Sequence, residues 1–131
     1  MKSQNIFVVT TITAFVFLGG IILLSSQTNP SNGPNQNNTS IIDGKQIVEI
    51  EAKGGYFPRY SIAKAHMPTL LKINTNGTFD CSSALSIPSL NYQKYLPATG
   101  ETLIEVPPQE SGTTLQGTCA MGMYNFAIKF M

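Results

Sequence analysis

Four sulfur-bearing side chains are the residues of this sequence best suited to chemistry. Cys119, Met121 and Met123 fall within five residues near the C-terminal end, and the only other cysteine, Cys81, lies far upstream. Thiolate and thioether sulfurs are soft ligands, and soft ligands select soft metals such as Cu(I). Brought together, the four residues predict a binding site for copper as Cu(I), with Ag(I) as a second soft metal that such a site would accept.

The two cysteines also have a simpler interpretation. An exported protein with two cysteines often has one structural disulfide. In that case the chain is a structural or interaction module stapled by Cys81–Cys119, without metal. A simple bridge does not need the neighbouring Met121 and Met123, although methionine is also an ordinary core filler. The two methionines share the parity of Cys119, so an extended chain places all three on one face, whereas a loop does not.

Enzyme activity finds little support in the sequence. There is no Ser/His/Asp set, no glycine-rich phosphate loop and no HExxH motif. The only histidine, His66, precedes a predicted strand over Thr69–Asn74 that leads toward Cys81. Six residues of strand span ~20 Å. We therefore expect His66 at the end of the domain far from the cysteines.

An apolar segment precedes the part of the chain that carries the sulfur ligands. Ile6–Leu24 contains no charged residue, and at helical rise its 19 residues span ~28 Å, close to the thickness of a bilayer's hydrocarbon core. Lys2 before the segment favours an orientation with the rest of the chain outside. Residues 1–26 are interpreted as an N-terminal transmembrane anchor, with a cleaved signal peptide as the alternative. Both interpretations place the remainder on the extracytoplasmic side, tethered at the membrane if the anchor is kept.

Residues 27–42 predict a flexible linker, and residues 43–131 one small domain. The linker range has no charge and is rich in asparagine, with too few apolar residues to pack. The domain range is long enough for a single core. Its basic and acidic residues cancel and do not cluster, so nothing indicates a nucleic-acid partner.

The domain range shows the pattern of an all-β protein. Lys45–Ala52 alternates, with Val48, Ile50 and Ala52 expected inside and the two glutamates outside. About seven short strands separated by turn signals predict a sandwich or small barrel. Ser89–Leu96 is expected to form one or two helical turns. The other predicted strands are Tyr60–Ala65, Thr69–Asn74, Ala84–Ile87, Thr102–Val106, Thr113–Cys119 and Tyr124–Phe130.

From Gly55 to Phe130 the chain resembles the cupredoxin family, most closely its small membrane-associated members with soft ligands. The resemblance rests on ordered pieces, among them Tyr56-Phe57-Pro58, Asp80-Cys81, Gly100, Gly112 and the ending Cys119-Ala120-Met121-Gly122-Met123. It implies a Greek-key β-sandwich or barrel. It also implies that Cys81 and Cys119 converge, with Tyr56 and Phe57 at the same end of the domain.

The resemblance also assigns the ligands. Cys81 takes the place usually held by a histidine, Cys119 matches the cysteine ligand, and Met121 and Met123 lie in the ligand loop where a histidine and a methionine are usual. Blue-copper sites need two imidazoles, so the missing histidines favour a Cu(I) carrier, chaperone or homeostasis protein over a copper electron-transfer protein. Such a carrier implies a partner membrane protein that delivers or accepts the metal.

Overall fold

The computed structural model of the protein describes Asn38–Met131. The predicted anchor or signal segment and most of the predicted linker lie outside these residues. Within them, no helix is long and apolar enough to cross a membrane.

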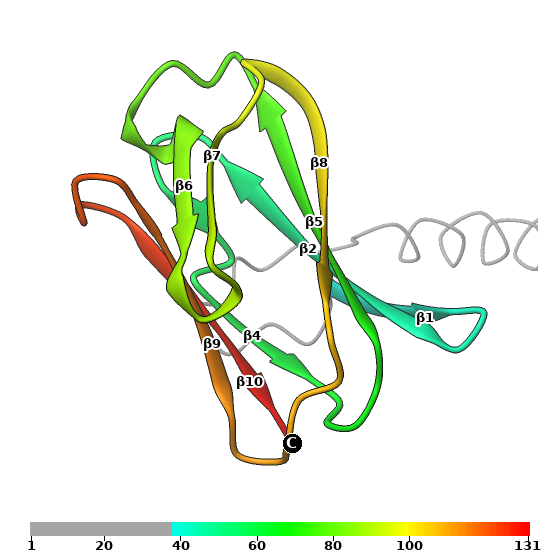
Figure 1. The fold of residues 1–131 in the computed structure, drawn as a ribbon. Coiled ribbons are helices and arrows are strands. Elements are labelled where there is room, and N and C mark those ends of the chain that lie inside the picture. Colours follow the sequence, from blue (N-terminus) through cyan, green and yellow to red (C-terminus); the bar gives the residue numbers. More distant parts are fainter. Residues whose placement is uncertain (1–37) are drawn as a thin grey trace, which may run out of the picture. The chain divides into compact units, whose positions relative to one another are not determined.

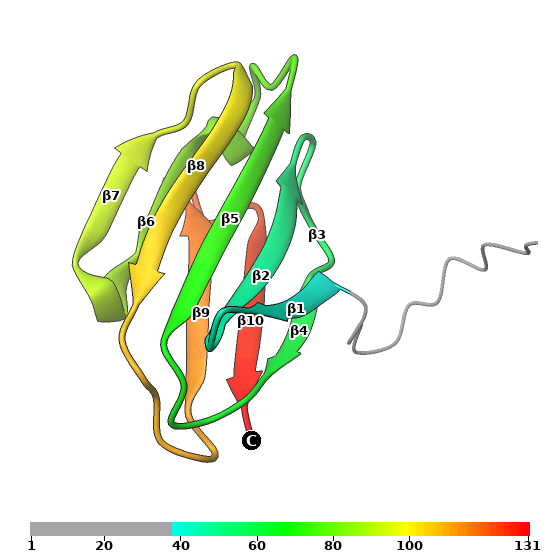
Figure 2. The same cartoon turned by 90° about the vertical axis from the view of Figure 1, so that its right-hand side faces the viewer.

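The described residues form an all-β sandwich of two mixed sheets (Figures 1 and 2). The first sheet has the order β1-β2-β5-β8, with the short β3 paired to β2, and the second has the order β4-β10-β9-β6-β7. The first sheet contains β1 (Thr39–Ile42), β2 (Lys45–Ala52), β3 (Tyr56–Phe57), β5 (Thr69–Asn76) and β8 (Thr99–Val106). The second contains β4 (Tyr60–Ala63), β6 (Ala84–Ile87), β7 (Tyr92–Tyr95), β9 (Thr114–Cys119) and β10 (Asn125–Phe130).

Strand β2 shows how the sequence pattern builds the core. Val48, Ile50 and Ala52 are buried while Glu49 and Glu51 are exposed, as the alternation predicted. β2 pairs in parallel with β5, and β4 pairs in parallel with β10. The inward residues of both sheets form one core. Its largest fully buried aliphatic and aromatic side chains are Tyr56, Phe126, Phe130, Ile50, Leu71, Ile73, Leu85, Ile87, Leu115 and Ile128.

The structure has more strands than the seven or so predicted. Thr39–Ile42, within the predicted linker range, forms β1 and pairs antiparallel with β2 through a turn at Asp43 and Gly44. Both turn residues have positive φ, the geometry that an Asp-Gly hairpin supplies. Ile47 points to the water side of β2 but is only partly exposed, because it lies between Ser40 of β1 and Leu70 of β5.

The helical turns expected over Ser89–Leu96 are wrong for most of that range. A single 3-10 turn, η3 (Pro88–Leu90), ends at Asn91 in the left-handed conformation, and Tyr92–Tyr95 then forms β7. β7 pairs antiparallel with β6. Tyrosine is favoured in strands, and a partner strand that satisfies the backbone outweighs the weak helical spacing of Leu90 and the tyrosines.

Candidate metal centre

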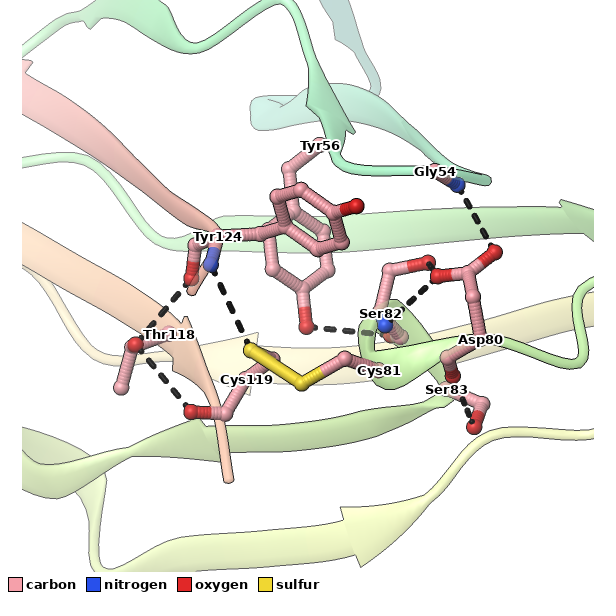
Figure 3. The surroundings of a disulfide bond; sticks show 9 residues. All are labelled: Gly54, Tyr56, Asp80, Cys81, Ser82, Ser83, Thr118, Cys119 and Tyr124. Carbon is pink, nitrogen blue, oxygen red and sulfur yellow. Dashed lines mark hydrogen bonds between the residues drawn. A yellow bond between two sulfur atoms is a disulfide. The ribbon is translucent and has the colours of Figure 1, made fainter. Parts of the chain in front are cut away.

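The two cysteines meet at one end of the sandwich, as the resemblance implied (Figure 3). Cys119 is the last residue of β9 and is buried, paired across the sheet with Leu85 of β6. Cys81 opens the 3-10 turn η2 (Cys81–Ser83), directly before β6. Their Cα atoms are 5.8 Å apart and their sulfurs form a disulfide. The structure thus brings both predicted thiol ligands together, in oxidised form.

The turn that carries Cys81 is held by the carboxylate of Asp80. Asp80 caps η2, where its Oδ1 accepts hydrogen bonds from the Ser82 N–H, at 2.8 Å, and from the Ser82 hydroxyl. Its Oδ2 accepts from the Gly54 N–H at 2.9 Å, which ties the turn to the β2–β3 connection. These hydrogen bonds, led by those from Ser82, lower the pKa of Asp80.

A buried tyrosine fixes the same turn from inside the sandwich. The Tyr56 hydroxyl donates to the Ser82 carbonyl oxygen at 3.0 Å (Figure 3). Its ring packs edge-on against Phe126, with ring centroids 5.2 Å apart. Burial, and secondarily the negative charge of Asp80, raises the pKa of Tyr56 to about 12. Tyr56 lies at the cysteine end as expected, whereas its neighbour Phe57 is largely exposed.

Backbone groups hold Cys119 at the base of a tight loop between β9 and β10. The Cys119 N–H donates to the Tyr124 carbonyl at 2.9 Å, and the Gly122 N–H donates to the Cys119 carbonyl at 2.8 Å. The Tyr124 N–H points at the Cys119 sulfur, 3.4 Å away. Because a hydrogen bond to the charged form of a group favours that form, this N–H would favour a thiolate at Cys119 if the bridge were reduced. Its role is invisible in the sequence, since it depends on the fold of the loop.

Met121 and Met123 lie in this loop with their side chains in solvent. They are 79% and 63% exposed, so neither is a core filler. The loop geometry removes the shared face that an extended chain would give them with Cys119. They are nevertheless the thioethers nearest in sequence to the buried cysteine, on long unbranched side chains that adapt readily to a ligand.

His66 lies where the sequence predicted, away from the cysteines. It precedes β5, while Cys81 follows the other end of that strand. Its backbone N–H donates to Gln109, and its imidazole is 3.8 Å from the Glu110 carboxylate. Residues 38–131 contain no cluster of three or more His, Cys, Asp or Glu side chains able to hold a metal ion.

Comparisons with known proteins give structural likeness alone. No protein-family model matches the chain, and no curated protein matches it. A search of solved structures finds the metal-binding domain of the Cu(I)-exporting P-type ATPase CopA of Streptococcus pneumoniae D39, solved with Cu(I). It is 20% identical, with a TM-score of 0.62 over 71% of this chain and 92% of that one.

A second similar structure is a copper-binding protein in its apo form, determined by NMR in solution. It is 19% identical, with a TM-score of 0.68 over 77% of this chain and all of the other. At these identities the likeness shows the fold: the described residues share the sandwich of two structures whose names record copper binding.

Proposed function

We propose that this chain is an extracytoplasmic copper-binding protein of the cupredoxin-like fold, most simply a carrier of Cu(I). Cys81 and Cys119 supply two thiolates, and Met121 and Met123 supply thioethers. The chain has no enzymatic role in this proposal. Its N-terminal apolar segment keeps the domain at the membrane, where a membrane protein delivers or accepts the metal.

The observation that carries the proposal is the meeting of the two cysteines at the base of a loop that carries two methionines. Two cysteines 38 residues apart in sequence meet with a Cα separation of 5.8 Å. The loop directly after Cys119 exposes two methionines that do not pack in the core. Two thiolates with thioethers form a soft donor set that suits Cu(I). The fold shared with two copper-binding structures supports the same assignment.

The disulfide defines the oxidised state of the same site. Thiolates are the metal ligands, so binding first requires a dithiol to reduce the Cys81–Cys119 bond. Two electrons and two protons then yield two thiols, and the thiol donor is itself oxidised to a disulfide. Coordination of Cu(I) releases the protons from the two cysteines. The Tyr124 N–H near the Cys119 sulfur favours this deprotonation.

The second candidate is a structural or interaction module, and the disulfide is the observation that favours it. A bridge closing a loop of this length stabilises a small domain by about 3–4 kcal/mol in the chain-entropy account. Under that function the bridge is permanent. The exposed methionines then have no assigned role.

An anaerobic Cu(I) titration of the full chain against a competing chelator separates the two functions. The reduced protein, the disulfide form and the variants Cys81→Ser and Cys119→Ser are compared. Met121→Leu with Met123→Leu tests the thioethers. Met131→Leu is the matched control, because Met131 is also exposed but its backbone pairs with Ala63 and Ala65 away from the cysteines.

We expect tight binding by the reduced chain only, lost in both serine variants. The double methionine variant should bind more weakly, and the Met131→Leu control should bind as wild type. Absence of binding by the reduced chain would refute the metal function and leave the stapled module. Binding that survives both serine substitutions would show that the copper lies elsewhere.

A further inference from the structure

The outer face of the first sheet carries a stripe of aliphatic side chains, with one residue from each of four neighbouring strands. Its members are Ile42 of β1, Ile47 of β2, Leu70 of β5 and Leu103 of β8. Ile47 and Leu70 are directly paired between β2 and β5. Ile42 is the diagonal neighbour of Ile47, and Leu103 is the diagonal neighbour of Leu70. Ile42 and Leu103 are 55% and 58% exposed. A continuous aliphatic path on a solvent face indicates an interaction surface.

An acidic rim surrounds the stripe. The Lys72 ammonium lies 3.0 Å from the Glu101 carboxylate and 3.8 Å from that of Glu49. The Lys45 ammonium lies 3.5 Å from Glu105. Glu51 points to the same side of the sheet. Both lysines in the strands of this sheet are thus paired, and the four glutamates of these strands outnumber them. The rim therefore favours a partner with basic groups.

The outer face of the second sheet has the opposite character. Tyr60, 39% exposed, and Ile62 lie on this face of β4, and their register partners on β10 are Ala127 and Lys129. No strand of this sheet contains an aspartate or glutamate. We call this surface the basic patch. It comprises Tyr60, Ile62 and Ala127 with the basic residues Arg59, Lys64 and Lys129.

We propose that the aliphatic stripe of one copy of this chain docks on the basic patch of a second copy. The two surfaces are the opposite outer faces of one sandwich, so a single copy cannot bring them together; Figure 2 views the first sheet with the second behind it. Apolar side chains meet apolar side chains, and glutamates meet lysines and arginine. A symmetric stripe-to-stripe contact would instead oppose the two acidic rims.

The size of the face sets the strength of the contact. Four strands of up to eight residues cover about 20 by 25 Å, or about 500 Å² per copy. Such an area belongs to weak, transient interfaces. The contact is head-to-tail, because each copy uses one face for one neighbour and the opposite face for another. Copies therefore add to a growing chain unless one of the two faces is blocked.

Sedimentation equilibrium of the full chain in density-matched detergent micelles, in its disulfide form, tests the contact. Leu103→Glu blocks the stripe and Tyr60→Glu blocks the basic patch. If near-UV circular dichroism shows that the Tyr60→Glu variant is misfolded, Lys129→Glu serves as the patch variant instead. Phe79→Glu is the control, because Phe79 is exposed in a loop outside both faces.

Wild type and the Phe79→Glu control should associate as the protein concentration rises. Their association should be weaker at about 0.5 M salt than at about 0.05 M, because salt screens the charge pairs. Each blocking variant alone should associate at least about tenfold more weakly. An equal mixture of Leu103→Glu with the patch variant should recover a 1:1 dimer, because each supplies the face that the other lacks.

Three outcomes would overturn the proposal. A monomeric wild type would mean that the stripe serves a different protein. Self-association of the patch variant alone would indicate a symmetric stripe contact. Association of both blocking variants at wild-type strength would place the interface elsewhere in the chain.

Discussion

Removal of one hydroxyl group, in Tyr56→Phe, isolates the contribution of the tyrosine that fixes the Cys81 turn. The substitution keeps the ring that packs against Phe126. It deletes only the hydrogen bond to the Ser82 carbonyl, 3.0 Å long and buried. Any change in stability therefore reports on that bond.

The expected magnitude follows from what the hydroxyl leaves behind. A typical intramolecular hydrogen bond contributes about 0.5–1.5 kcal/mol net, but a buried acceptor left without a donor costs about 1–3 kcal/mol. Ser82 is fully buried, so the larger range applies. We expect Tyr56→Phe to lower the free energy of unfolding by about 1–3 kcal/mol. Because Ser82 follows Cys81, the variant should also bind Cu(I) less tightly.

Urea unfolding of the reduced and disulfide forms measures the loss, with Tyr95→Phe as the matched control. Tyr95 is exposed at the end of β7, so its hydroxyl should contribute little. The destabilisation should be larger in the reduced form, where the bridge no longer restrains the turn. A loss below about 0.5 kcal/mol, or one equal to that of the control, would refute the reasoning.

Three further predictions concern the same end of the domain. Gly117→Ala should lower the free energy of unfolding by about 1–3 kcal/mol in thermal unfolding, because a Cβ there would collide with the Phe126 ring; wild-type stability would contradict this packing. The lowered pKa of Asp80 means that its carboxylate stabilises the fold above about pH 4 and that this contribution is lost as the pH falls through the folded pKa. Asp80→Asn should therefore flatten the acid side of a urea-midpoint profile, and an unchanged profile would count against the capping role. Tyr56, with its pKa raised to about 12, contributes stability below pH 10 that is lost as the pH rises toward 12; Tyr56→Phe should remove this alkaline dependence, and its persistence would assign it to another group.

The alternation of apolar and polar residues along the sequence predicted those strands that have one face in the core and one in water. β2 has the predicted bounds and the predicted buried face, because two-residue periodicity states directly which side chains point inward. β1 was missed for the opposite reason. Its four residues bury almost nothing and form a strand only because β2 offers a hydrogen-bonding edge.

The candidate site was predictable in part. The family resemblance, and no local pattern, indicated that Cys81 and Cys119 meet. The exposure of Met121 and Met123 could not be predicted, because the parity argument holds in an extended strand and fails in the loop. The hydrogen bond from the Tyr124 N–H to the Cys119 sulfur likewise depends on loop geometry that side-chain identity does not encode.

The position of β10 in the second sheet makes the closure of the sandwich depend on the last strand of the chain. This strand is the last along the chain, yet it lies between β4 and β9 in the interior of the sheet. Its inward residues Phe126, Ile128 and Phe130 are fully buried. A nascent chain that has not released β10 leaves β4 without a partner in its sheet and leaves the core open. The pairing of β4 and the burial of these three side chains therefore both depend on the docking of the last strand.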